Sequence, residues 1–291
     1  MMTPIFSLPC AILLSCAKSL LYRGVSAPTA GKRGFWAVNT LSFFISACIL
    51  AVFAVLIGSL RTVSYQTVLL AIPFALITLA AQVFYIRAQH LGTVSLNTFL
   101  YSCGFIIPVL YSIIRLREPV KAMQIAGLLL LLFTLYLYLL PQKTMVNVKW
   151  LACILIASFS SGFLGVLQKV QQNTPYAAEL DGFLIIAFLL CALLSAMLYC
   201  ISGRKESRQS GALRPSVRVA AVCMGIVAAL LNRVNLSLAG ALPGMIFYPV
   251  FNGPVTLLSG IAAYLVYREK TNVRQWISLC LGIAAIALIA L

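Results

Sequence analysis

Polar side chains recur at helical spacing inside otherwise apolar stretches of this 291-residue chain. Asn97 and Tyr101 are four residues apart, and so are Tyr248 and Asn252. Residues at this spacing share one face of an α-helix, so each pair presents an amide and a phenol to the same side. Because burying an amide without a partner in hydrocarbon is costly, these groups must face other protein groups or a wet cavity.

Two more polar stripes follow the same rule. Gln82 and Tyr85 share a face of one apolar stretch, and Asn232 and Asn235 lie one helical turn apart in another. Hydrogen bonds between helices would explain each residue taken singly, because polar side chains often join helices inside membranes. If all four stripes instead meet at one cavity, they form a binding site for a small polar molecule. We predict this second arrangement.

Charged side chains inside apolar stretches are costlier still. Arg233 is predicted to lie deep in such a stretch, where an arginine costs about 2.5–3.5 kcal/mol unless it meets water, carbonyl groups or a counter-charge. Contact with a substrate or gate explains Arg233 functionally, whereas snorkelling or pairing with backbone carbonyls is the structural alternative. Lys18 and Lys169 lie nearer the ends of their stretches, where snorkelling explains each alone, and we include both among the candidate site residues. The pattern places all five acids in loops or at helix ends: Glu118, Glu179, Asp181, Glu206 and Glu269.

This distribution of charge predicts the kind of molecule that the site would bind. With cations but no acid expected in the membrane core, the site should prefer an anionic or strongly hydrogen-bonding substrate. An aromatic cage is the alternative, because aromatic rings hold a cationic amine without any carboxylate. Five aromatic residues could build that cage: Tyr85, Tyr101, Phe247, Tyr248 and Phe251.

Composition indicates that the helices carrying these stripes lie in a lipid bilayer. Apolar residues make up 62% of the chain and charged residues 9%, with a mean hydropathy of +1.04. A soluble protein carries about a quarter charged residues, so this chain must face lipid. Long continuous apolar runs predict helices, since strands of a membrane barrel would alternate in polarity. The net charge of +16 comes from basic residues between the apolar runs, which predicts cytoplasmic loops and no nucleic-acid partner.

A membrane helix needs about 20 apolar residues, and this rule predicts ten transmembrane helices. The fold class is therefore all-α integral membrane. The expected spans are Pro4–Tyr22, Phe35–Gly58, Thr67–His90, Ser95–Leu116, Ala122–Leu140, Trp150–Gln172, Gly182–Gly203, Val217–Pro243, Gly244–Tyr267 and Gln275–Leu291.

The second five spans repeat the first five. Sliding the chain on itself by 151 positions places Lys18 on Lys169 and Asn97 on Tyr248, and it aligns two Arg-Glu pairs that begin at Arg117 and Arg268. Units with an odd number of spans are inverted relative to each other, an architecture typical of secondary transporters. We predict a first five-helix repeat over residues 1–147 and a second over residues 148–291, integrated in one membrane domain.

The ends of these two repeats carry a family resemblance. The residues are Tyr248-Pro249, Gly253-Pro254, Tyr267-Arg268-Glu269-Lys270, Gln275-Trp276 and Gly282 in the second repeat, and Pro108, Arg117-Glu118-Pro119, Gln124 and Gly127 in the first. With its span count, the chain resembles the EamA-type transporters of the drug/metabolite transporter superfamily. The resemblance implies a ten-helix carrier whose earlier spans line a central cavity, and it identifies fold better than substrate.

Sidedness follows from the basic residues, and here charge and resemblance disagree. Connections after odd-numbered spans hold 13 Lys and Arg, against 4 after even-numbered spans. Because basic loops stay in the cytoplasm, this bias predicts that both termini lie outside. The resemblance implies both termini inside, and we favour the charge count. The expected location is the plasma (inner) membrane.

Motifs for other chemistry are missing from the sequence. No Gly-x-x-x-x-Gly-Lys-Ser/Thr loop is present, and the single histidine, His90, cannot complete a His-Glu-x-x-His site. We therefore expect no enzyme, cofactor or metal, but a secondary carrier that works by alternating access. Its partners would be a small-molecule substrate, the lipid bilayer and a coupling ion of unassigned identity, in a monomer or homodimer. A passive channel and a membrane enzyme are the alternatives from other classes.

Overall fold

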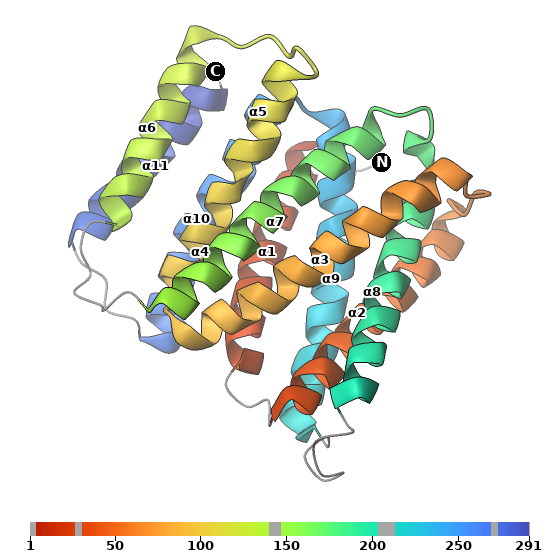
Figure 1. Cartoon of the computed structure of the whole chain (residues 1–291). Helices are drawn as coiled ribbons and strands as arrows, with labels where there is room; N and C mark the ends of the chain where they lie inside the picture. Colours follow the sequence, from red (N-terminus) through yellow and green to blue (C-terminus); the bar gives the residue numbers. More distant parts are fainter. Residues whose placement is uncertain (1–3, 27–30, 140–146, 203–212, 269–272, 291) are drawn as a thin grey trace.

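A computed structural model describes the chain except for residues 1–3, 27–30, 140–146, 203–212, 269–272 and 291 (Figure 1). Glu206, Glu269 and Lys270 therefore lie outside the described residues. The described residues are helical, with no strand among them. The elements are α1 (Pro4–Ser26), α2 (Gly31–Ile57), α3 (Tyr65–Leu91), α4 (Val94–Ser102), η1 (Cys103–Phe105), α5 (Ile106–Ile114), α6 (Ala122–Leu139), α7 (Val148–Gln172), η2 (Ala177–Glu179), α8 (Leu180–Ser202), α9 (Pro215–Ala241), α10 (Gly244–Tyr267) and α11 (Val273–Ala290).

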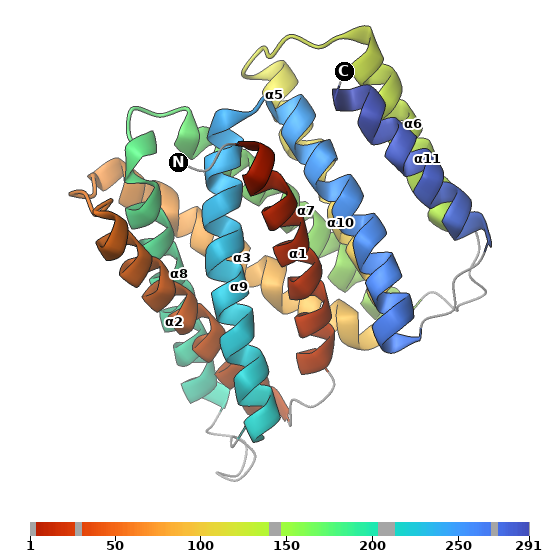
Figure 2. The same cartoon turned by 180° about the vertical axis from the view of Figure 1, so that it is seen from behind.

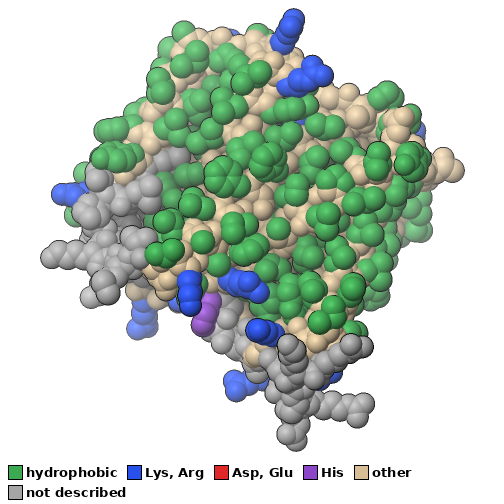
Figure 3. Space-filling model, in the orientation of Figure 1, with side chains coloured by type: hydrophobic (Ala, Val, Ile, Leu, Met, Phe, Trp, Pro, Cys, Tyr) green, Lys and Arg blue, Asp and Glu red, His purple; other side chains and the backbone are tan. Residues whose placement is uncertain are grey.

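The helices have the length and polarity that a bilayer requires. Within the described residues, eight segments are long and apolar enough to cross a membrane, and α4, η1 and α5 together form one of them, Val94–Ile114. Apolar side chains cover the broad face in Figure 3, whereas Lys and Arg lie toward its edges. The chain is therefore a multi-pass helical membrane protein. Helices α6 and α11 are shorter, with 18 residues each.

The two halves of the chain interleave rather than lie apart. Helix α2 packs on α8, and α6 packs on α11 at one end of the molecule (Figures 1 and 2). Other contacts occur in matched pairs when the halves are exchanged. Helix α3 contacts α7 as α9 contacts α1, and α2 contacts α9 as α8 contacts α3.

Helix ends also match between the halves, but not at the predicted spacing. Helix α3 ends at Leu91 and α9 at Ala241, whereas α4 begins at Val94 and α10 at Gly244, so these ends are 150 residues apart. Beyond this point α6 begins at Ala122 and α11 at Val273, which gives 151. The shift of 151 is therefore one residue too long at this break.

The one-residue difference has a physical cause in η1. A 3-10 helix rises about 2 Å per residue, so the three residues Cys103–Phe105 span about the same length as four α-helical residues. On the spacing of 150 that follows the break, Asn97 matches Phe247 instead of Tyr248. One residue in a helix is a rotation of about 100°, so the two spacings pair different faces.

The left-handed residues mark where the larger spacing begins. Among the described residues, Arg117 and Arg268 are the two non-glycine residues with positive φ, at 54° and 53°. They are 151 residues apart. Each follows the fourth long segment of its half, and Arg268 ends α10. The sequence shift of 151 is therefore correct for these two turns.

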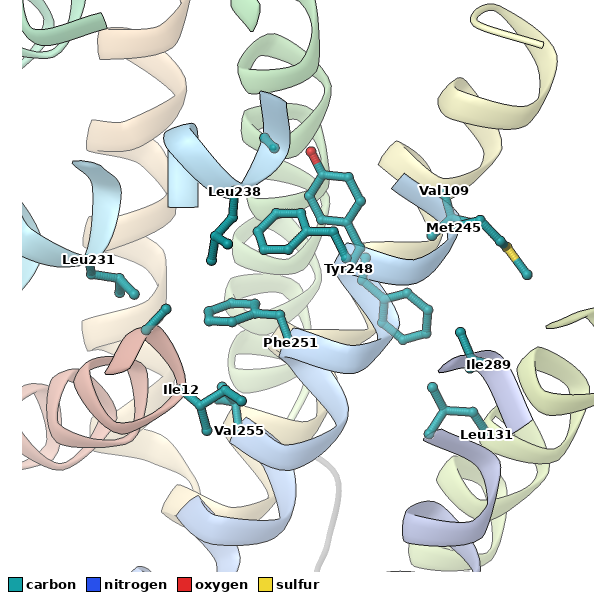
Figure 4. Close-up of a cluster of buried hydrophobic side chains, with 14 of the residues drawn as sticks. Ile12, Val109, Leu131, Leu231, Leu238, Met245, Tyr248, Phe251, Val255 and Ile289 are labelled. Carbon is teal, nitrogen blue, oxygen red and sulfur yellow. The ribbon is translucent and has the colours of Figure 1, made fainter. Parts of the chain in front are cut away.

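Helix α10 lies at the centre of the largest apolar cluster (Figure 4). Phe251 and Val255 of α10 face α1 and α9, which contribute Ile12 and Leu231. The other side of α10 faces α6 and α11. Helix α10 is thus held by packing on both of its sides.

Glycines allow close packing at two contacts between the halves, η1 on α7 and α2 on α9. A Cβ at Gly104 would lie 2.2 Å from the backbone oxygen of Ser158, and one at Gly225 would lie 2.5 Å from that of Ser42. Only glycine fits at these distances. These contacts bring η1 onto α7 and α2 onto α9, and they fix the walls that surround the site.

The two helix breaks lie at opposite edges of the molecule. In Figure 1, α3 passes into α4 at the lower edge, and α9 passes into α10 at the upper edge. Helices α1, α6, α8 and α10 end at the lower edge, and the C-terminus lies at the upper edge. The connections predicted to be rich in Lys and Arg therefore follow helices that end on one side.

Candidate functional site

A cavity lies between α1, α4, α5, α7, α9 and α10, with Tyr85 of α3 at its margin. Its volume, measured at the centres of water-sized molecules, is about 90 Å³. One enclosed water needs roughly 10–15 Å³ on this measure, so the cavity holds roughly six to nine waters or a small metabolite. Helices of the first half and helices of the second half both contribute to its lining. A site between two repeats would be lined in this way.

Seven of the eleven predicted site residues line this cavity. They are Lys18, Tyr85, Tyr101, Asn232, Asn235, Tyr248 and Asn252. Gln82, Asn97, Lys169 and Arg233 do not line it. The four polar stripes therefore meet only in part.

Lys18 is the charged residue of the cavity lining. Its Nζ atom lies 5.4 Å from the centre of the Tyr22 ring. Among the described residues, no carboxylate lies within ion-pair distance of Lys18. The described acids Glu118, Glu179 and Asp181 all accept hydrogen bonds from other residues. The cavity therefore presents a positive charge without a protein counter-charge in the described part of the chain.

Three asparagine amides, from α9 and α10, also line the cavity. Asn232 donates its Nδ2 to the Ala228 carbonyl at 2.9 Å, and Asn252 donates its Nδ2 to the Tyr248 carbonyl at 2.9 Å. Each side chain thus bonds the preceding turn of its own helix through one N–H and keeps its Oδ1 and its second N–H for other partners. The buried Oδ1 of Asn235 has no hydrogen-bond partner among the described residues.

Aromatic rings form the apolar part of the lining. The Tyr85 and Tyr101 ring centroids lie 4.4 Å apart, and Phe247 lies 4.8 Å from Tyr248 and 5.9 Å from Phe251. The Tyr248 hydroxyl donates to the Gly165 carbonyl at 2.7 Å, which joins α10 to α7. This bond holds the ring in place and uses the polar end of the phenol.

Asn97 is a structural residue and not part of the cavity, contrary to the prediction. Its side chain is fully buried. Its Nδ2 donates to the Ala88 carbonyl at 2.9 Å, and its Oδ1 accepts from Trp150 Nε1 at 2.7 Å. Asn97 thus fastens the end of α3 and the start of α7 to α4. Asn97 is one helical turn from Tyr101, but its side chain points toward α3 and α7 instead of the cavity.

Gln82 likewise belongs to a hydrogen-bond network outside the cavity. Its Oε1 accepts from the Tyr22 hydroxyl at 2.8 Å, and its Nε2 donates to Asn39 Oδ1 at 3.0 Å and Ser42 Oγ at 3.1 Å. This network joins α1, α2 and α3. Interhelical bonding, the alternative explanation for such a residue, is the one that the structure supports here.

Arg233 has a protein counter-charge, which the sequence pattern did not predict. Its Nε lies 2.8 Å from Asp181 Oδ1, and its guanidinium lies 4.3 Å from the centre of the Phe53 ring. Asp181 is only 4% exposed, because it stands in the first turn of α8 and packs against other helices. The expectation that carbonyls, water or a ligand would meet this charge is therefore wrong.

Lys169 is held in a second buried ion pair. Its Nζ lies 3.0 Å from Glu118 Oε1 and donates to the Leu242 carbonyl at 2.8 Å. Glu118 Oε2 accepts from the backbone N of Gly244 at 2.6 Å, where the positive end of the α10 dipole favours a carboxylate. The cluster secures the break between α9 and α10 and gives Lys169 a structural role.

Six polar residues of the cavity lining were not predicted: Ser15, Ser19, Thr98, Ser102, Ser161 and Gln168. Five of them carry hydroxyl groups, whereas the predicted stripes were defined by amides, phenols and charges. Ser161 and Gln168 are seven residues apart and share a face of α7, so polar spacing at i and i+7 would have revealed this stripe.

Comparison with known proteins gives the fold of the chain but not its function. No family model matches the sequence, and no curated protein matches it. A solved structure described only as "Crystal structure of protein" matches with a TM-score of 0.68. The match covers 97% of this chain and 98% of that chain at 17% identity. At this identity the likeness shows a shared fold alone.

Proposed function

We propose that this protein is a secondary carrier that moves a small polar metabolite, preferably an anion, across a membrane by alternating access. The observation that carries this proposal is Lys18, a cation in the cavity lining with no acidic partner among the described residues. A buried charge needs a counter-charge, and a ligand with an anionic group supplies one.

The architecture that fits this mechanism is a pair of inverted repeats with ten spans. In this proposal α6 and α11 cross the membrane as the fifth span of each half, over residues 1–147 and 148–291. The contacts that pair off when the halves are exchanged support this arrangement, and so do the matching helix ends. An odd number of spans per unit makes the units inverted.

The resemblance to EamA-type transporters points the same way, and it remains part of the proposal. We also propose that the protein lies in the plasma (inner) membrane with both termini outside. Basic side chains at the ends of α1, α7 and α9 support this orientation: Arg23, Lys149, Arg214 and Arg218. Such clusters of basic residues stay on the cytoplasmic side.

No catalysis is required in this proposal. The carrier would need only its substrate, the bilayer and any coupling ion, and it would act as a monomer or homodimer without a resident cofactor. A passive pore of the same fold would differ by showing flux that does not saturate.

A second candidate is a carrier for a cationic amine held by aromatic rings. The close rings of Tyr85 and Tyr101 and the group at Phe247 favour it. Lys18 opposes it, because a cation in the same cavity would repel the amine. The two candidates therefore predict opposite effects when the charge of Lys18 is removed.

The discriminating experiment is a binding screen on the purified protein and on its Lys18→Gln variant. Thermal stabilisation is recorded with small anions, zwitterions and cationic amines of matched size, since a ligand that binds the folded state raises the melting temperature. We expect stabilisation by anions that falls at least tenfold in apparent affinity in the variant. Lys149→Gln, which removes an exposed lysine, is the matched control and should behave as the wild type. Stabilisation by amines that improves in Lys18→Gln would establish the aromatic-cage alternative instead.

A further inference from the structure

The amides of the cavity have a common polarity. In Asn232 and Asn252 one N–H of the Nδ2 group is occupied by the carbonyl four residues earlier in the same helix. An amide has two N–H donors and one oxygen with two lone pairs, so each side chain keeps one N–H and its whole Oδ1 acceptor for a ligand. The Oδ1 of Asn235 is buried and lacks a partner among the described residues. The wall formed by α9 and α10 thus offers three amide oxygens as acceptors, beside the N–H donors that these amides keep.

Lys18 on α1 offers the opposite chemistry. An ammonium has donors and no acceptor. A ligand that satisfies both sides must therefore carry an anionic acceptor for Lys18 and hydrogen-bond donors for the amide oxygens. A simple apolar carboxylate would leave the buried Oδ1 of Asn235 unpaired, and an unsatisfied buried acceptor is costly.

The donors on the ligand should be hydroxyl groups and not an ammonium. None of the acids in the described part of the chain lines the cavity. An ammonium would therefore enter a site with neutral oxygens, and it would also meet Lys18. Hydroxyl groups donate to carbonyl oxygens without bringing a second positive charge.

We infer that the cavity selects small hydroxylated organic anions, with the anionic group on Lys18 and hydroxyl groups on the oxygens of Asn232, Asn235 and Asn252. This inference rests on the proposed carrier function and narrows its substrate class. The volume of about 90 Å³ sets the size, because room for roughly six to nine waters suits a molecule with a similar number of heavy atoms.

The test uses three acids that differ only in hydroxyl groups: propanoate, 2-hydroxypropanoate and 2,3-dihydroxypropanoate. Alanine is added because it replaces the 2-hydroxyl by an ammonium. Apparent dissociation constants come from the concentration dependence of thermal stabilisation of the purified full chain. One hydrogen bond between uncharged groups changes affinity by about fivefold. We expect about fivefold tighter binding for each added hydroxyl, with alanine weaker than 2-hydroxypropanoate.

Variants assign the preference to the amides. Asn235→Leu keeps the size of the side chain and removes the acceptor, so it should reduce the preference for the hydroxylated acids by about fivefold. Asn252→Leu tests the same wall from α10, and it is used if Asn235→Leu does not fold. Asn97→Leu is the control: it removes a buried amide outside the cavity and should leave the preference unchanged.

The outcomes separate this inference from the function on which it rests. Equal binding of propanoate and 2,3-dihydroxypropanoate, lost for both in Lys18→Gln, would leave an anion carrier but overturn the selection of hydroxyl groups. Tighter binding of alanine than of 2-hydroxypropanoate would also overturn it. If none of these acids binds the wild-type protein, the proposed function itself fails.

Discussion

The ion pair between Lys169 and Glu118 allows a quantitative prediction. The side chain of Lys169 is 4% exposed and that of Glu118 15%, so little water replaces a lost partner. Removing one member of a buried ion pair costs about 3–5 kcal/mol because the other charge stays buried. Each partner here keeps a second contact, Lys169 with the Leu242 carbonyl and Glu118 with the Gly244 backbone N. We therefore expect Lys169→Met to lower the free energy of unfolding by about 3 kcal/mol, the lower end of that range.

A double-mutant cycle isolates the pair from its other contacts. With Glu118→Gln as the second change, the double variant should lose less than the sum of the two single losses, by about 2 kcal/mol. Unfolding is followed by circular dichroism in mixed micelles as the dodecyl sulfate fraction is raised. Lys149→Met removes an exposed lysine at the start of α7 and should change stability by less than about 0.5 kcal/mol. If the double variant instead loses the sum of the two single losses, Lys169 and Glu118 do not stabilise each other, contrary to their 3.0 Å contact.

Three further changes test structural roles. Arg233→Gln breaks the ion pair with Asp181 and should lower the free energy of unfolding by about 3 kcal/mol. Anion affinity, measured by thermal stabilisation, should stay within twofold of the wild type. A tenfold loss of affinity would show that Arg233 contributes to the binding site. Gly104→Ala places a Cβ 2.2 Å from the Ser158 oxygen and should lower stability by about 1–3 kcal/mol, measured in the same unfolding assay; an unchanged midpoint would contradict this packing. Asn97→Leu leaves its helix partners without their hydrogen bonds and should destabilise by about 1–3 kcal/mol without altering anion affinity; weaker anion binding would place Asn97 in the site.

The sequence predicted the helices well because the bilayer sets their length and polarity. Helix α10 has the predicted bounds, Gly244–Tyr267, where a proline precedes the first residue and a left-handed residue follows the last. Apolar run length thus predicts which residues are helical, but it does not predict how the helices rotate.

Rotation explains why the site was predicted only in part. Asn97 and Tyr101 are one turn apart, yet only Tyr101 lines the cavity. The break between α3 and α4 turns Asn97 toward Trp150, and no pattern within one helix contains that information. Similarly, the 3-10 segment Cys103–Phe105 changes the spacing of the halves from 150 to 151, which an ungapped comparison of sequences does not detect.

Burial of the acids was the other feature that the sequence did not reveal. Asp181 was assigned to a helix end, and it does stand in the first turn of α8. A helix end is not always exposed, however, and Asp181 accepts hydrogen bonds from Ser59 and from Arg233 of α9. The partner Arg233 is 52 residues away in the chain, so the pair becomes visible only when the helices are packed.

Trans-stimulated exchange in proteoliposomes tests the central claim most directly. Vesicles with the reconstituted protein are loaded with the unlabelled anion that stabilises the purified protein most, and uptake of the same labelled anion is followed. A carrier predicts saturable uptake that rises several-fold over that of unloaded vesicles and is lost in Lys18→Gln but not in Lys149→Gln. Uptake that grows linearly with concentration and ignores internal anion would contradict alternating access and indicate a pore.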